Sequence, residues 1–83
     1  MKKPRIDSVK VGMVFDTNTT TVYGIKNYAK VTKRPYLSKR GDMPDIFYAT
    51  FVDPHNFRRK RLPNDREFAV WDFNYAKWGK RVK

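Results

Sequence analysis

The segment from Ile46 to Val52 constrains the fold of this chain more than any other. It is an uncharged run of seven residues, and all but one of them are β-branched or aromatic. Such side chains fit the pleated, half-buried surface of a sheet and are enriched in strands. Turn-forming residues bound the run, with Pro44 before it and Asp53 and Pro54 after it. The segment predicts a β-strand between two turns.

Two further strands are predicted before this run. Val11, Met13 and Phe15 recur at the period-two spacing of a strand with one buried face. A second strand is predicted over residues 20–34, with Gly24 as a bulge or bend. Alternation in its later part places Ala29 and Val31 toward the interior, and Tyr28, Lys30, Thr32 and Arg34 toward solvent.

The last third of the chain supports two interpretations. Residues 57–62 are predicted to form a short strand and residues 67–72 another, followed by a short helical turn, because aromatic side chains favour sheets. A single helix over residues 65–78 is the alternative. Its support is one helical stripe, which consists of Phe68, Trp71, Tyr75 and Trp78.

These elements predict a mainly β fold in one domain, residues 1–83. The first 62 residues form an antiparallel meander, and a fifth strand makes a small, partly open barrel with a short C-terminal helical turn. The alternative is an α+β fold, a four-stranded antiparallel meander with helix 65–78. The segment Val9 to Phe15 and the strand spacing resemble SH3-like barrels of the KOW and Tudor kind, a fold that serves many functions. The basic ends, 1–5 and 80–83, are expected to be flexible.

Composition narrows the possible chemistry. The chain has no cysteine and a single histidine, so we expect no disulfide, no metal site and no cofactor. His55 lies two residues from Asp53 in a proline-containing turn, where both are expected to be turn formers. No stretch approaches the ~20 apolar residues of a membrane span, and no apolar signal-peptide core follows the basic start. We expect a cytoplasmic protein, associated with the nucleoid if it is bacterial or viral.

The net charge of +11 predicts a polyanionic partner. Aromatic residues make up 16% of the chain, which indicates a folded domain rather than a disordered polycation. The charge is unevenly distributed. Residues 1–40 contain ten basic and two acidic residues, residues 41–57 three acidic and no basic residues, and residues 58–83 nine basic and three acidic residues.

The densest basic feature is the run from Arg58 to Arg61. Four adjacent cations would be favoured on nucleic acid by the release of condensed counterions. Three of them are arginines, which bind phosphate with a planar fork of donors. Two alternatives are an edge strand charged against aggregation and a patch for a protein or a membrane surface.

Two other basic segments carry aromatic residues, which can stack on bases or sugars. One is the outward face of the second strand with the loop after it, and the other is the C-terminal tail. The predicted nucleic-acid-binding residues are Arg58, Arg59, Lys60, Arg61, Tyr28, Lys30, Arg34, Tyr36, Lys39, Arg40, Lys77, Lys80 and Arg81.

The sequence therefore predicts a nucleic-acid-binding protein that is not an enzyme. Contacts to the phosphate backbone would dominate, sequence specificity would be low, and duplex DNA would be slightly preferred over RNA. One alternative is a protein-interaction module that binds an acidic surface of a larger nucleic-acid-processing protein and modulates it. A second alternative is a small metal-independent ribonuclease, since Gly12 to Asp16 resembles the start of MazF-like toxin ribonucleases.

Overall fold

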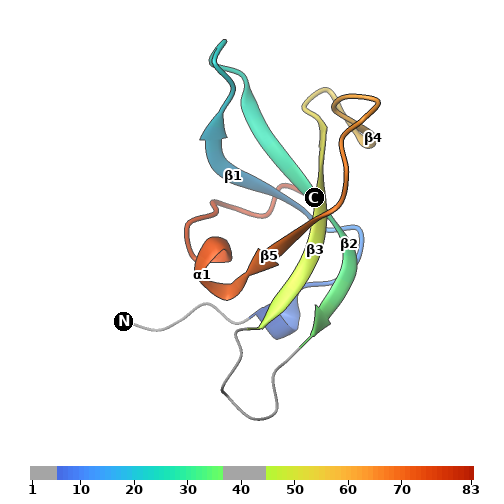
Figure 1. Cartoon of the computed structure of the whole chain (residues 1–83). Helices are drawn as coiled ribbons and strands as arrows, with labels where there is room; N and C mark the ends of the chain where they lie inside the picture. Colours follow the sequence, from blue (N-terminus) through green and yellow to red (C-terminus); the bar gives the residue numbers. More distant parts are fainter. Residues whose placement is uncertain (1–5, 37–44) are drawn as a thin grey trace.

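The computed structural model describes residues 6–36 and 45–83, which form a small sheet with one short helix packed on it (Figure 1). The predicted flexible segment 1–5 lies outside the described residues. The elements, in chain order, are the 3-10 turn η1 (Ile6–Ser8), β1 (Val14–Thr20), β2 (Lys26–Tyr36), β3 (Ile46–Asp53), β4 (Asn56–Lys60), β5 (Phe68–Trp71) and α1 (Asp72–Tyr75).

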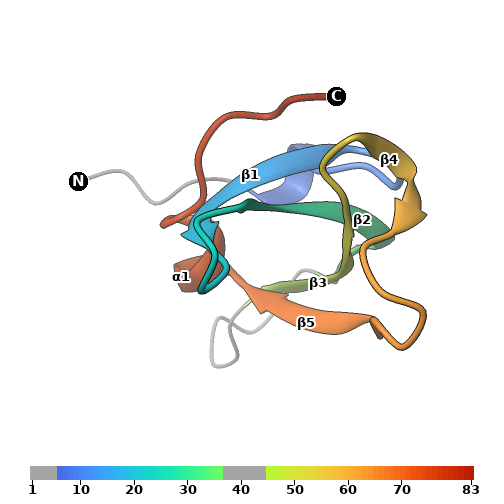
Figure 2. The ribbon, with the colours of Figure 1, turned by 90° about the horizontal axis from the view of Figure 1, so that it is seen from above.

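The five strands form one open antiparallel sheet with β3 at its centre. The order is β1-β2-β3-β4, and β5 also pairs with β3. Since β2 runs along one edge of β3, β4 and β5 share the other edge. Val52 of β3 faces Lys60 of β4, and Ala49 faces Phe68 of β5. Figure 2 shows the strands and α1 curving around a common interior. The predicted mainly β fold with a short C-terminal helix is confirmed.

The strand interpretation of the last third is correct, and the alternative helix over 65–78 is wrong. The free edge of β3 explains the outcome, because β5 satisfies the backbone groups that would otherwise be unpaired there. Val70, outside the helical stripe, is fully buried, whereas Trp71, a member of that stripe, is exposed.

The inner face of the sheet carries the core. Ala29 and Val31 are buried there, as predicted, and Phe47 is the largest fully buried side chain. Tyr75 and Trp78 pack their rings edge-on against Phe47, each with centroids 5.7 Å away. Residues after β5 thus close the interior of the curved sheet.

The start of the first strand differs from the predicted alternation. Gly12 has a φ of 95°, and the chain turns there, so β1 begins only at Val14 and Val11 is exposed. Phe15 is buried in the core as predicted, but Val14 is buried too. Val14 faces Lys30 across the sheet and lies outside the core cluster, because it belongs to the other face.

The C-terminal residues cover the outer edge of β1. Gly79 donates its N–H to the Asp16 carbonyl at 2.6 Å, and Val82 donates to the Val14 carbonyl at 2.8 Å. The segment 80–83, which the sequence predicts as a flexible end, is therefore hydrogen-bonded along a strand. This contact blocks an edge that could otherwise pair with another chain.

Gly79 is needed where this segment meets β1. A Cβ at this position would lie 2.8 Å from Oδ1 of Asn18, whose Nδ2 donates to the Lys77 carbonyl. We expect Gly79→Ala to displace that amide and to lower the free energy of unfolding by about 1 kcal/mol, the value of one hydrogen bond. Urea denaturation of both proteins measures the difference.

The control is the same substitution in an Asn18→Gly background. Asn18 has a φ of 58°, a conformation that glycine adopts readily. With the amide removed, Gly79→Ala should change the stability by no more than a few tenths of a kcal/mol. An equal cost in both backgrounds would contradict the steric explanation.

A second prediction concerns Tyr75. Burial raises the pKa of its phenol above the ordinary value of about 10. The folded chain therefore keeps this proton when the unfolded chain has lost it. The resulting stability is present below about pH 10 and is lost as the pH rises through the folded pKa. Ultraviolet titration should show a late tyrosine that Tyr75→Phe removes and that Tyr23→Phe, at an exposed position, retains.

Candidate nucleic-acid interface

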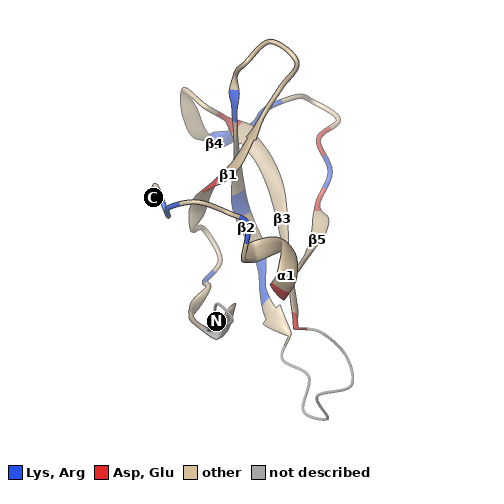
Figure 3. Cartoon of the chain, turned by 90° about the vertical axis from the view of Figure 1, so that its left-hand side faces the viewer, with Lys and Arg blue, Asp and Glu red and all other residues tan. Residues whose placement is uncertain are grey.

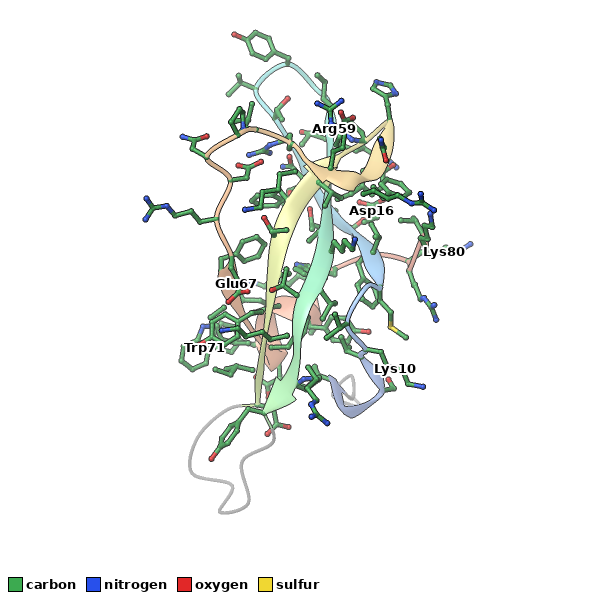
Figure 4. All side chains as sticks on the ribbon, turned by 90° about the vertical axis from the view of Figure 1, so that its right-hand side faces the viewer. Lys10, Asp16, Arg59, Glu67, Trp71 and Lys80 are labelled. Atoms are coloured by element: carbon green, nitrogen blue, oxygen red, sulfur yellow. The ribbon has the colours of Figure 1, made fainter. Side chains whose placement is uncertain are left out.

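The face of the sheet opposite the core carries the predicted aromatic and basic residues. Directly opposed residues on neighbouring strands share a face. The register therefore places Tyr28 of β2, Val52 of β3 and Lys60 of β4 in one row. Lys30 and Thr50 lie in the adjacent row. Figure 4 views the molecule from this outer face, with α1 behind the sheet.

Aromatic rings and cations alternate on this outer face. The rings of Tyr28 and Phe57 contact each other, with centroids 5.2 Å apart. Farther along β2, the Lys33 ammonium lies 5.1 Å from the centroid of the Tyr48 ring. Lys30 lies between these two pairs along β2. The prediction that Tyr28 and Lys30 share a solvent-facing surface with cations agrees with this arrangement.

The basic run divides into two parts. Arg58, Arg59 and Lys60 belong to β4 and are exposed. They form no ion pair with any of the described residues. Because β4 lies on the open edge of the sheet, these three side chains have free access to solvent, and we call them the β4 cations. They are the strongest positive feature of the described surface.

Arg61 has a different role. Its Nη1 donates to Oδ1 of Asn27 at 2.7 Å, its Nε lies 3.4 Å from Oδ2 of Asp65, and its guanidinium stacks 4.6 Å from the centroid of the Phe51 ring. Its side chain is only 27% exposed. Arg61 therefore links β2, β3 and the loop after β4, and its charge is neutralised within the chain.

This division predicts unequal effects of substitution along the run. Arg61→Gln should lower the free energy of unfolding by about 1–3 kcal/mol, because it leaves part-buried partners unpaired. Arg58→Gln, whose side chain is exposed and has no ion pair among the described residues, should leave stability within about 0.5 kcal/mol. Thermal and urea unfolding of the two variants make the comparison. Equal stabilities would show that the contacts of Arg61 do not support the fold.

Two carboxylates on or beside the outer face are neutralised locally. The Asp16 carboxylate lies 3.4 Å from the Lys26 ammonium. Glu67 accepts a hydrogen bond of 2.8 Å from Thr32 and lies 3.3 Å from the Lys33 ammonium. The Thr32 hydrogen bond, with the nearby lysines, lowers the pKa of Glu67. Their pairing leaves the excess positive charge with the β4 cations and Lys30.

The other predicted residues are dispersed. Arg34 and Tyr36 are exposed near the end of β2 that is farthest from β4. Arg81 faces Phe15 across β1 and so lies on the core side, whereas the neighbouring Lys80 lies on the outer side. Lys77 follows α1. Figure 3 shows the basic positions along β2 and in the C-terminal segment. Lys39 and Arg40 lie outside the described residues.

The structure also shows an exposed feature that sequence reasoning missed. Val22 and Tyr23, at the tip of the β1–β2 hairpin, are the most exposed of the large apolar side chains that the structure describes. Both residues fall inside the strand that is predicted over residues 20–34. In the sequence, Gly24 is the signal against a continuous strand. In the structure, Gly24 has a φ of 80° and forms the turn.

The β3–β4 turn contains the single histidine of the chain. Asp53 Oδ1 accepts the His55 N–H at 2.8 Å, the turn-forming contact expected for this pair. The described residues contain no group of three or more histidine, cysteine or acidic side chains placed to hold a metal ion. Within residues 6–36 and 45–83, no helix is long and apolar enough to cross a membrane.

Comparison with protein-family models, with curated proteins and with solved structures gave no match for this chain.

Proposed function

We propose that this protein is a non-enzymatic nucleic-acid-binding domain that contacts the phosphate backbone with the outer face of its sheet. The observation that carries the proposal is that Lys60 lies in one row with Tyr28 on the outer face, where Phe57 contacts Tyr28, and that Arg58 and Arg59 are exposed on the same strand. Exposed cations bind phosphates by displacing the counterions condensed on the nucleic acid, and the release of those counterions favours binding.

The geometry favours a duplex over a single strand. Single-stranded nucleic acid binds through aromatic rings that are free to stack on bases. Here the rings of Tyr28 and Phe57 pack on each other and are half-buried, so they offer little free stacking surface. Cations on a sheet edge suit the regular phosphate backbone of a duplex. Backbone contacts carry no base information, so sequence specificity should be low, with duplex DNA slightly preferred over RNA.

A triple variant tests the proposal. Arg58→Gln, Arg59→Gln and Lys60→Gln together remove the β4 cations and keep the buried contacts of Arg61. We expect at least tenfold weaker binding to a short DNA duplex near physiological salt, and a decrease of about 2–3 in the slope of log affinity against log salt. Fluorescence anisotropy at several salt concentrations measures both quantities.

The matched control removes the same charge elsewhere. Lys10→Gln, Arg66→Gln and Lys83→Gln change three exposed cations that do not lie on β4 and are not predicted to contact nucleic acid. This control should retain most of the affinity. Equal losses in the two triple variants would show that net charge, not the β4 cations, determines binding. Wild-type protein that binds neither DNA nor RNA at low salt would contradict the proposed function and favour an acidic protein surface as the partner.

A further inference from the structure

The tip of the β1–β2 hairpin presents apolar side chains to solvent. Val22 and Tyr23 are 95% and 87% exposed, and Ile25 is 50% exposed. Burying such a side chain stabilises a protein, and here the fold leaves that free energy unused. Three large apolar residues within four positions, on a chain with this much charge, form an interaction surface rather than scattered exposure.

The backbone beneath these side chains is ordered by hydrogen bonds. Thr21 donates its N–H to the Ile25 carbonyl at 2.8 Å, and its Oγ1 accepts the N–H groups of Tyr23 and Ile25 at 3.2 and 3.3 Å. Below the turn, Asn27 Nδ2 donates to Thr19 Oγ1 at 3.1 Å. The tip therefore holds its side chains outward on a formed turn, which reduces the entropy that a binding partner must remove.

The hairpin extends farther than the strands beside it. Tyr28 of β2 faces Val52 of β3, and β3 turns back at once through residues 53–56. The hairpin continues from Tyr28 for five more residues to Tyr23. Figure 1 shows it projecting beyond the β3–β4 turn. The tip can therefore enter a groove while the body of the sheet remains outside.

The exposed positive charge near the base of the hairpin belongs to the β4 cations, because Lys26 and Arg61 are paired with Asp16 and Asp65. Lys60 lies in the same row as Tyr28, where the hairpin leaves the sheet. Figure 4 shows Arg59 at this end of the sheet, below the tip. The apolar tip thus lies far from the body of the sheet, and the cations lie close to it. A duplex has the complementary arrangement, with phosphates outside and stacked bases inside its grooves.

We propose that Val22 and Tyr23 form a wedge that enters the minor groove of duplex DNA and partly separates two stacked base pairs, while the β4 cations hold the flanking phosphates. Apolar side chains inserted at a base step kink the duplex and expose bases for contact. This inference rests on the proposed function and specifies which part of the duplex the protein deforms.

The test compares a perfect duplex with the same duplex carrying one central mismatch. A mismatch lowers the cost of separating the stack, so a protein with a wedge binds it more tightly. We expect wild-type protein to prefer the mismatched duplex by about tenfold, from an unstacking cost of a few kcal/mol per step. A double variant, Val22→Ser with Tyr23→Ser, should lose that preference.

The matched control is Val11→Ser with Phe73→Ser. These residues are also a valine and an aromatic residue, 59% and 56% exposed, and lie away from the hairpin tip. The control should keep the preference for the mismatch. Both pairs of residues are exposed, so circular dichroism should show intact folds.

Three outcomes overturn the wedge. The first is that the tip variant keeps the mismatch preference, and the second is that wild-type protein binds both duplexes equally. The third is binding to a protein partner that requires Tyr23 but not the β4 cations. In the second case wild-type protein still binds duplex, so the proposed function survives. Wild-type protein that binds no nucleic acid would instead contradict the proposed function itself.

Discussion

The aromatic cluster around Phe47 is the interaction on which the other features of this protein depend. Tyr75 and Trp78 meet Phe47 edge-on, and both also contact Phe15, with centroids 5.4 and 5.8 Å away. The helix α1 has four residues and is too short to be stable alone. Ring packing therefore fixes the chain after β5. It also directs residues 79–83 onto β1, which covers the outer edge of that strand.

Because the inner face supplies the core, the outer face can carry charge. Among the described residues, only small or β-branched side chains, such as Val14, Thr50 and Val52, are buried on that side. They share rows with Tyr28 and Lys30, whose long side chains can cover them with apolar atoms while their polar ends reach water. The surface that we propose for nucleic acid thus also protects the second side of the central strand. The apolar parts of these side chains cover the buried residues, and their polar ends are the groups that we propose to face nucleic acid.

The sequence predicted the parts of the fold that depend on local pattern. The run from Ile46 to Val52 forms β3, and Ala29 and Val31 face the core. Residues 65–78 fit both a strand and a helix periodicity. The free edge of β3 decided between them, and local pattern cannot reveal such an edge. The same limit explains Arg61. Four adjacent cations look equivalent in sequence, but the strand ends at Lys60, and the turn brings Arg61 to Asn27, which is 34 residues away.

The exposed hairpin tip could not be predicted from residue type, because valine and tyrosine are common in strands. What is unusual is that these two residues lie at an exposed turn. Val22 and Tyr23 lie beyond the point where β3 turns back into β4. Since the β3–β4 turn comes early, the hairpin continues alone, and these side chains gain nothing from folding. Any free energy from their burial remains for a contact outside the chain. In the proposed complex, the exposed β4 cations attract phosphate and repel basic protein surfaces.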